Sequence, residues 1–176
     1  KMSSFLLIYS STDGHTKTIC ERIKNFLNNG NLVELLSLKD AKRIDLFKFE
    51  KIIIGASIRY GKHSKELYNF INLNKNILDQ KKSTFFSVNV VARKPEKNTA
   101  ETNPYVNKFL KLSKWKPKKI KVFAGKVDYP SYNFFDKYII KFIMFITNGP
   151  TDTSQSYEFT DWSKVEDFSE ELRNSY

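Results

Sequence analysis

The chain contains little cysteine and little histidine, with one Cys and two His among 176 residues. This set is too small for a disulfide framework or a structural zinc site, so we predict no bound metal. Cys20 lies beside Ile19 and Ile23 on the apolar side of an expected helix. We therefore expect a buried, unreactive thiol rather than a nucleophile, and such sparing use of cysteine fits the reducing cytoplasm.

Membrane spans and nucleotide signatures are missing as well. Residues 132–146 are dense in Phe, Tyr, Ile and Met, but the run is too short, and Lys141 too near its centre, to cross a bilayer. The first apolar run is also short and lacks a small-residue cleavage site, so we expect no signal peptide. There is no Gly-Lys-Ser or Gly-Lys-Thr of a triphosphate loop and no Gly-x-Gly-x-x-Gly of a dinucleotide fold.

Acidic residues are outnumbered, because 19 Asp and Glu face 30 Lys and Arg, which gives a net charge of +11. This balance favours an anionic partner such as nucleic acid, a membrane surface or an acidic substrate. Lys, Asn, Ile and Phe are all frequent, so codon drift in an AT-rich genome explains part of the excess. A nucleic-acid module on the basic turn at residues 114–121 would need interleaved aromatics, and only Trp115 is there. We therefore predict no nucleic-acid partner.

Apolar runs that fit buried strands alternate with amphipathic helices. Hydrophobic residues make up 40% of the chain, enough for the core of one domain over residues 1–176. Strands are expected at residues 5–9, 32–38, 51–56, 83–90 and 120–125. Helices are expected after residue 16, from Ser64, from Pro104 with Asn103 as the cap, and over residues 162–172. The alternation predicts an α/β fold with a doubly wound parallel sheet of five strands.

Three loops fall at the carboxyl ends of these strands, where such sheets bind ligands: residues 10–16, 57–61 and 89–94. The first loop is rich in hydroxyls, contains Gly14 and leads from a buried strand into a helix. Free backbone N–H groups and the helix dipole make such a turn a phosphate site, although an ordinary strand-to-helix turn is the alternative. A phosphorylated receiver domain would need an acidic cluster at these ends, and none is seen.

One segment interrupts the alternation. Residues 128–150 lie between the last strand and the last helix and are far longer than a usual connection. On a helix, Asn133, Lys137 and Lys141 form a narrow polar stripe in an otherwise apolar surface. Such a helix could pack on the domain, pair with another copy or lie in a bilayer interface. We favour the membrane surface, contacted through residues 132–146.

The motifs resemble a known family. Residues 11–16 are similar to the flavodoxin phosphate loop T-x-T-G-x-T, with Asp13 as a departure at its third position. The Asp-Gly-x-Thr form resembles one subfamily, the menaquinone-dependent protoporphyrinogen oxidases. Further stretches similar to this subfamily are residues 55–61, 87–97, 124–125, 129–130, 138–144 and 149–153.

The resemblance implies a flavodoxin-like sheet of order 2-1-3-4-5 with an insert, residues 128–150, before the last helix. It implies FMN as the cofactor and oxidation of protoporphyrinogen IX to protoporphyrin IX in haem biosynthesis. Electrons would pass to menaquinone or ubiquinone, with the protein bound peripherally to the cytoplasmic face of the inner membrane. A homo-oligomer is left open. The alternative is a flavodoxin-type FMN electron carrier, which would have acidic flavin loops.

The resemblance also implies the residues that bind the cofactor. Tyr60 is the candidate to stack on the flavin, with a surface aromatic as the alternative. Asp13 would disfavour a phosphate unless its oxygens accept backbone N–H groups and brace the loop. The cofactor-binding residues expected are Ser10, Ser11, Thr12, Asp13, Gly14, His15, Thr16, Ser57, Ile58, Arg59, Tyr60, Gly61, Val88, Asn89, Val90, Val91, Ala92, Arg93, Asp152 and Thr153.

No side chain is assigned a certain catalytic role, because flavin accepts a hydride without protein help. Arg59 and Arg93 are candidates to stabilise reduced flavin or to meet the propionates of a porphyrinogen. Two solvated arginines are the alternative. His15 is expected to contribute its backbone amide to the phosphate loop. His63 is expected to be a surface loop histidine, with a proton acceptor as the alternative.

Overall fold

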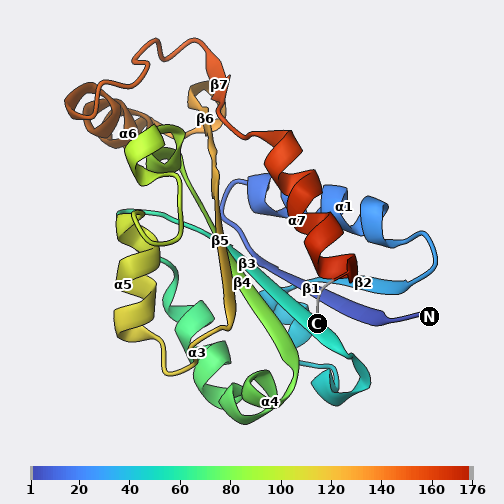
Figure 1. The fold of residues 1–176 in the computed structure, drawn as a ribbon. Coiled ribbons are helices and arrows are strands. Elements are labelled where there is room, and N and C mark those ends of the chain that lie inside the picture. The colour runs from blue at the N-terminus through green and yellow to red at the C-terminus, as the bar shows by residue number, and fades with distance from the viewer. Residues whose placement is uncertain (1, 175–176) are drawn as a thin grey trace.

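The fold is built on one parallel sheet, seen in a computed structural model that describes residues 2–174 (Figure 1). Its five strands are hydrogen-bonded in the order β2-β1-β3-β4-β5, which confirms the fold class and the strand order predicted above. The strands are β1 (Ser4–Ser10), β2 (Leu32–Ser37), β3 (Lys51–Ser57), β4 (Lys82–Asn89) and β5 (Lys119–Ala124).

Helices cover both faces of the sheet (Figure 1). On one face lie α1 (His15–Leu27) and α7 (Trp162–Asn174), and on the other lie α3 (Lys65–Leu73), α4 (Lys75–Gln80) and α5 (Pro104–Leu112). Alternate strand residues supply the two cores: Leu6, Ile52 and Phe85 pack toward α3 and α5, and Leu7, Ile53 and Phe86 pack toward α1 and α7. Shorter helical segments are α2 (Leu38–Ala41), η1 (Leu46–Lys48), η2 (Val90–Arg93), η3 (Pro95–Lys97) and η4 (Tyr129–Ser131).

Local signals place most strand ends within one residue of their observed positions. The side chain of Asn103 caps α5, with its Oδ1 accepting from the backbone N–H groups of Tyr105 and Val106. The helix expected from Ser64 is two helices, because the chain breaks at Asn74, whose side chain donates to the carbonyl of Phe70. The second strand ends one residue early, since Ser37 caps α2.

The middle of the sheet is tightly packed. Gly55 on β3 pairs with Phe86 on β4, and a Cβ added at Gly55 would lie 2.1 Å from Cζ of that ring. Glycine is required here because the fully buried Phe86 ring fills the space a side chain would need. Cys20 is buried in the core beside α7, and burial raises the pKa of its thiol, so it is the inert residue predicted.

The segment after β5 forms a separate layer beyond the carboxyl edge of the sheet (Figure 1). It leaves along β6 (Lys126–Asp128) and returns along β7 (Ser156–Glu158), and the two strands pair antiparallel. This ribbon was not predicted, because strands of three residues carry no periodicity of their own. Between them lies α6 (Phe134–Ile146), the helix expected within residues 132–146.

The α6 helix leaves most of its apolar side chains exposed. Within this helix only Asp136 and Met144 are buried. The polar stripe expected from the sequence did not include Asp136. The exposed side chains are Phe134, Phe135, Tyr138, Phe142, Ile143, Phe145 and Ile146. No helix within residues 2–174 has the length and apolar character needed to cross a bilayer.

Candidate functional site

A cavity of about 430 Å³ opens where β1, β3 and β4 end. The three predicted loops meet here because the carboxyl ends of parallel strands lie at one edge of the sheet. Predicted residues that line the cavity are Ser11, Asp13, Gly14, His15, Thr16, Ser57, Ile58, Arg59, Tyr60, Gly61, Val88, Asn89, Val90, Val91 and Arg93. Ser10, Thr12, Ala92, Asp152 and Thr153 are not among the lining residues, within the part of the chain described.

The turn after β1 is shaped to receive an anion. Gly14 precedes α1 with a φ of +88°, and its N–H donates to Oγ of Ser11 at 2.9 Å. The hydroxyl of Thr16 is fully buried in the first turn of α1 and finds no hydrogen-bond partner among residues 2–174. A buried unpaired hydroxyl is costly, so its retention points to an acceptor supplied by a ligand. The residues present therefore fit the phosphate of a bound FMN.

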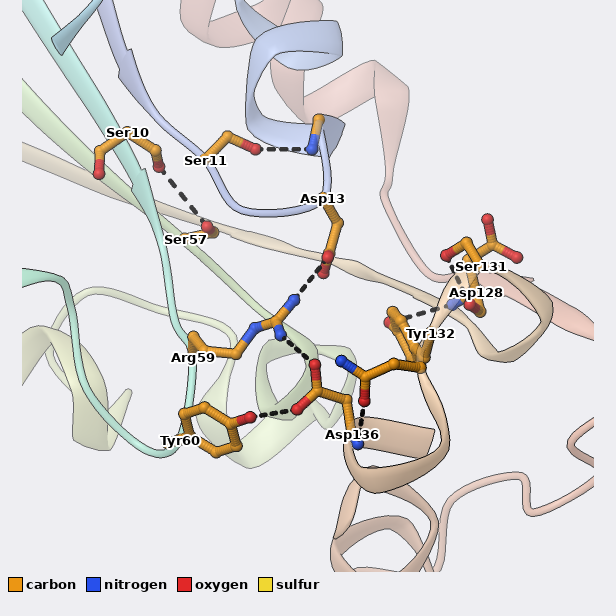
Figure 2. Close-up of polar contacts among 12 residues, drawn as sticks. Ser10, Ser11, Asp13, Ser57, Arg59, Tyr60, Asp128, Ser131, Tyr132 and Asp136 are labelled. Carbon is orange, nitrogen blue, oxygen red and sulfur yellow. Dashed lines mark hydrogen bonds and ion pairs between the residues drawn. The ribbon is translucent and has the colours of Figure 1, made fainter. Parts of the chain in front are cut away.

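Asp13 does not brace the loop as expected. Its Oδ1 accepts from Nη2 of Arg59 at 2.6 Å, so an ion pair rather than backbone N–H groups offsets its charge. Nη1 of the same guanidinium donates to Oδ2 of Asp136 at 2.8 Å. Figure 2 shows Arg59 reaching from the loop after β3 to lie between these two carboxylates. The coulombic attraction of Asp13 and Asp136 raises the pKa of Arg59 against the opposing effect of burial.

Tyr60 and Gly61 form the tip of a tight hairpin turn. Both have positive φ, 54° and 76°, and the backbones of Arg59 and Lys62 exchange hydrogen bonds across the turn. Positive φ at both central residues is the pattern of a type I′ turn. The Tyr60 ring is 56% exposed, and its hydroxyl donates to Oδ1 of Asp136 (Figure 2). Tyr60 thus lines the cavity, and its stacking on a flavin stays a prediction.

The loop after β4 is held by a buried network of amides. Oδ1 of Asn89 accepts from the N–H of Ala92 and from Nδ2 of Asn103, while its own Nδ2 donates to Oδ1 of Asn103. A further bond runs from Nδ2 of Asn89 to Oγ of Ser87 at 3.0 Å. These bonds fix the backbone of η2, so Asn89 shapes the cavity wall chiefly by holding this loop.

The expectation that His63 is a surface histidine is wrong. Its side chain is buried, with Nε2 2.9 Å from Oγ of Ser87 and edge-on contacts to Phe85 and Phe109. Burial lowers the pKa of His63 to about 4, with a smaller contribution from the charge of Lys108. The imidazole is therefore neutral near pH 7 and does not line the cavity.

The ring of His15 contacts residues that precede or begin α7. Nε2 lies 2.7 Å from Oγ1 of Thr160, and the ring meets Trp162 edge-on at 6.0 Å. Burial lowers the pKa of His15, although the nearby charge of Glu158 opposes this. The expected role of the His15 backbone amide in the phosphate loop stays a prediction.

Arg93 also lines the cavity, but its environment differs from that of Arg59. Its Nη2 donates to the carbonyl of Thr147 at 2.9 Å, and its Nη1 donates to the carbonyl of Val90 at 3.1 Å. The guanidinium also lies 5.7 Å from the centre of the Phe159 ring. Among residues 2–174 it forms no ion pair with a carboxylate, and burial lowers its pKa. It is thus the cavity arginine whose charge is not offset by a carboxylate of the described residues.

Asp152 and Thr153 lie in the segment that returns from α6. Oδ1 of Asp152 accepts from the N–H and the hydroxyl of Ser154, which makes a local turn. These two hydrogen bonds lower the pKa of Asp152. Asp152 and Thr153 do not line the cavity, and their part in cofactor binding stays a prediction.

The sequence pattern missed part of the cavity wall. From α6 and the ribbon come apolar and polar groups that include Ile139, Ile140, Ile143, Met144, Val127 and Tyr132. The signal that could have found them is Asp136, a lone acidic residue three positions after the helix cap Asn133 in an apolar helix. An isolated carboxylate in such a helix needs a partner, and the arginines in the loops after β3 and β4 were the candidates at that edge of the sheet.

Comparison with known proteins agrees with this geometry. The family model described as a flavodoxin domain matches residues 6–154. A protoporphyrinogen IX dehydrogenase (quinone) of Leishmania major is 45% identical over 169 residues, which span 95% of this chain and 73% of that protein. The protein of the same name from Escherichia coli K12 is 36% identical, over 95% of this chain and 93% of the relative.

This chain belongs to the protoporphyrinogen IX dehydrogenase branch of the flavodoxin family. The family resemblance read from the motifs is thereby confirmed. Oxidised flavodoxin 1 from Bacillus cereus superposes with a TM-score of 0.56 over 99% of both chains, at 15% identity, and so shares the fold. In this chain Arg59, Arg93 and residues of α6 line the cavity.

Proposed function

We propose that this protein is an FMN-dependent oxidoreductase that converts protoporphyrinogen IX to protoporphyrin IX and passes the electrons to a respiratory quinone. The observation that carries the proposal is a single cavity with an anion-binding turn at one side and an apolar wall from α6 at another. The names of the two curated relatives support this substrate and this class of acceptor. When bound, FMN supplies the hydride and electron chemistry.

The residues of the turn after β1 would hold the phosphate. The unpartnered Thr16 hydroxyl would donate to one oxygen, and free N–H groups at the start of α1 would donate to the others. Arg59 would keep the negative charge of Asp13 from repelling the dianion, because the two groups are 2.6 Å apart. The loops after β3 and β4 would then bracket the flavin ring.

The two arginines would have separate tasks. Arg59 is already offset by two carboxylates, whereas the Arg93 guanidinium has none within ion-pair distance among the residues described. We therefore assign recognition of a substrate propionate, or of negative charge on reduced flavin, to Arg93 first. A planar guanidinium suits a carboxylate, and partial burial strengthens the attraction.

We further propose that the exposed apolar face of α6 contacts the cytoplasmic surface of the inner membrane. Quinones such as menaquinone or ubiquinone are dissolved in lipid, so the cavity must come close to the bilayer. Phe142 and Phe145 are among the exposed side chains, at 63% and 71%, while Lys137 and Lys141 on the same helix can meet anionic headgroups. Each such lysine adds about 1 kcal/mol of attraction to an anionic leaflet.

Sedimentation with vesicles tests the membrane proposal. Replacing Phe142 and Phe145 together by Ser should strongly reduce binding to vesicles that contain anionic phospholipid. Phe47→Ser is the matched control, because Phe47 is also an exposed aromatic and lies outside α6. If the double variant bound vesicles as well as the Phe47→Ser control, the proposal would be rejected. A change in oligomeric state without a change in vesicle binding would assign the face to a second copy of the chain instead.

A direct assay tests the reaction. FMN-loaded protein is mixed with protoporphyrinogen IX without oxygen, and the fluorescence of protoporphyrin is followed with and without a quinone. We expect quinone-dependent turnover. An FMN electron carrier would bind flavin and accept electrons from a reductase but form no porphyrin above the rate with free FMN, and that result would overturn the proposal.

A further inference from the structure

The feature that leads beyond the assigned function is a buried carboxylate on an otherwise exposed helix. Asp136 lies in the first turn of α6 and is 8% exposed, while its neighbours Phe134 and Phe135 face solvent. Burying a carboxylate is unfavourable unless it is paired and hydrogen-bonded. Asp136 has both kinds of partner, since one oxygen accepts from Arg59 and the other from the Tyr60 hydroxyl (Figure 2).

Both partners come from the same hairpin turn after β3. The turn places Tyr60 at a φ of 54°, a left-handed backbone that an aromatic residue adopts at a cost. The ring is largely exposed, so burial does not explain why tyrosine is used there. A side chain as long as tyrosine is needed there for a hydroxyl to reach Asp136, which Asn or Gly could not do. The guanidinium of Arg59 lies 5.8 Å from the Tyr60 ring and completes the cluster.

Arg59 links this cluster to the phosphate turn. One guanidinium bridges Asp136 of α6 at 2.8 Å and Asp13 of the turn after β1 at 2.6 Å. The far end of α6 is fastened separately, where Arg93 donates to the carbonyl of Thr147 at 2.9 Å. The helix that forms the apolar wall of the cavity is thus tied at both ends to loops of the sheet.

We propose that Asp136 is a positioning residue that holds Arg59 and Tyr60 together, fastens the first half of α6 over the cavity, and couples that helix to occupancy of the phosphate turn through Asp13. The coupling follows from the shared guanidinium. A ligand phosphate that orders the turn around Asp13 also restricts Arg59, and a restricted Arg59 restricts Asp136. This inference rests on the proposed FMN site only for the coupling; the fastening of α6 does not need a ligand.

Hydrogen–deuterium exchange of the whole protein tests the fastening first, without FMN. D136N removes the charge at nearly constant size. We expect exchange of the α6 amides and of residues 59–62 to rise about tenfold or more, because a hydrogen bond to a charged group is lost and local opening becomes easier. Exchange in β4 should not change. The matched control is D167N, the same change at an exposed position of α7. D136E, which restores the charge, should recover part of the protection.

The second measurement adds FMN and reads the coupling. In the unmodified protein, FMN should slow exchange both in residues 10–16 and in α6. In D136N, FMN should still slow residues 10–16 but no longer slow the first half of α6. Unchanged α6 exchange in D136N, or faster exchange over the entire sheet, would overturn the positioning role. Equal slowing of α6 by FMN in both proteins would overturn the coupling. Absence of any FMN effect in either protein would contradict the cofactor site itself, and the ligand-free comparison would still decide the fastening.

Discussion

The unpartnered hydroxyl of Thr16 predicts that its removal raises the stability of the ligand-free protein and lowers the affinity for FMN. Thr16→Val removes the hydroxyl at almost constant shape. In the protein without ligand, the buried Oγ1 has no partner among the described residues, so its removal relieves a desolvation cost of about 1–3 kcal/mol. For a chain of 176 residues, 1 kcal/mol corresponds to a rise in Tm of roughly 2–4 °C. We therefore expect the ligand-free variant to be more stable than the unmodified protein.

The same substitution should weaken FMN binding. A hydrogen bond to a charged acceptor contributes about 1.5–3 kcal/mol, so losing it raises the Kd for FMN roughly ten- to hundredfold. Thermal unfolding without ligand and fluorescence titration with FMN measure the two effects. Riboflavin, which has no phosphate, should bind both proteins alike.

The matched control is Ser83→Ala. Ser83 also has a buried hydroxyl without a partner among residues 2–174, but it lies near the start of β4, at the end of the strand away from the cavity. This variant should gain stability and bind FMN normally. An unchanged Kd for FMN in Thr16→Val, together with a normal Kd in the control, would refute the assignment of the phosphate to this turn.

Two further predictions concern stability. Burial lowers the pKa of His63 to about 4 from an unfolded value of 6.5, so its contribution, about 3 kcal/mol, is present above pH 6.5 and is lost as the pH falls toward 4. His63→Gln should flatten the stability profile from urea unfolding over that range, and an unaltered slope would contradict the buried neutral imidazole. Gly55→Ala should destabilise the protein by about 1–3 kcal/mol or more, because the new methyl would lie 2.1 Å from the Phe86 ring. Urea unfolding measures this loss. Equal urea midpoints for the variant and the unmodified protein would show that the ring can move aside.

The sheet and its cavity loops were predictable because their signals are local. Continuous apolar runs such as residues 51–56 predict buried parallel strands, and the hydroxyl-rich turn around Gly14 predicts a phosphate site whatever surrounds it. The structure confirms the fold class and brings the three loops together. Asn103 followed by Pro104 likewise predicts the start of α5 correctly.

What could not be predicted depends on contacts between distant segments. Asp136 is 77 residues from Arg59, and no periodicity links them. His63 follows a polar loop and so suggests exposure, yet Phe85 and Phe109 cover it once the strands and α5 pack. The ion pairs of Arg59 could not be predicted for the same reason, since Asp13 and Asp136 come from other elements of the fold.

The pairing of β6 with β7 bears on whether the segment that carries α6 can be removed. Because the chain departs from the sheet at Lys126 and comes back beside that point at Glu158, the start and the finish of the excursion are neighbours. A two- or three-residue bridge could therefore replace the whole excursion without stretching the flanking backbone. A chain shortened in this way would show how much of cofactor binding the sheet and its loops supply without α6.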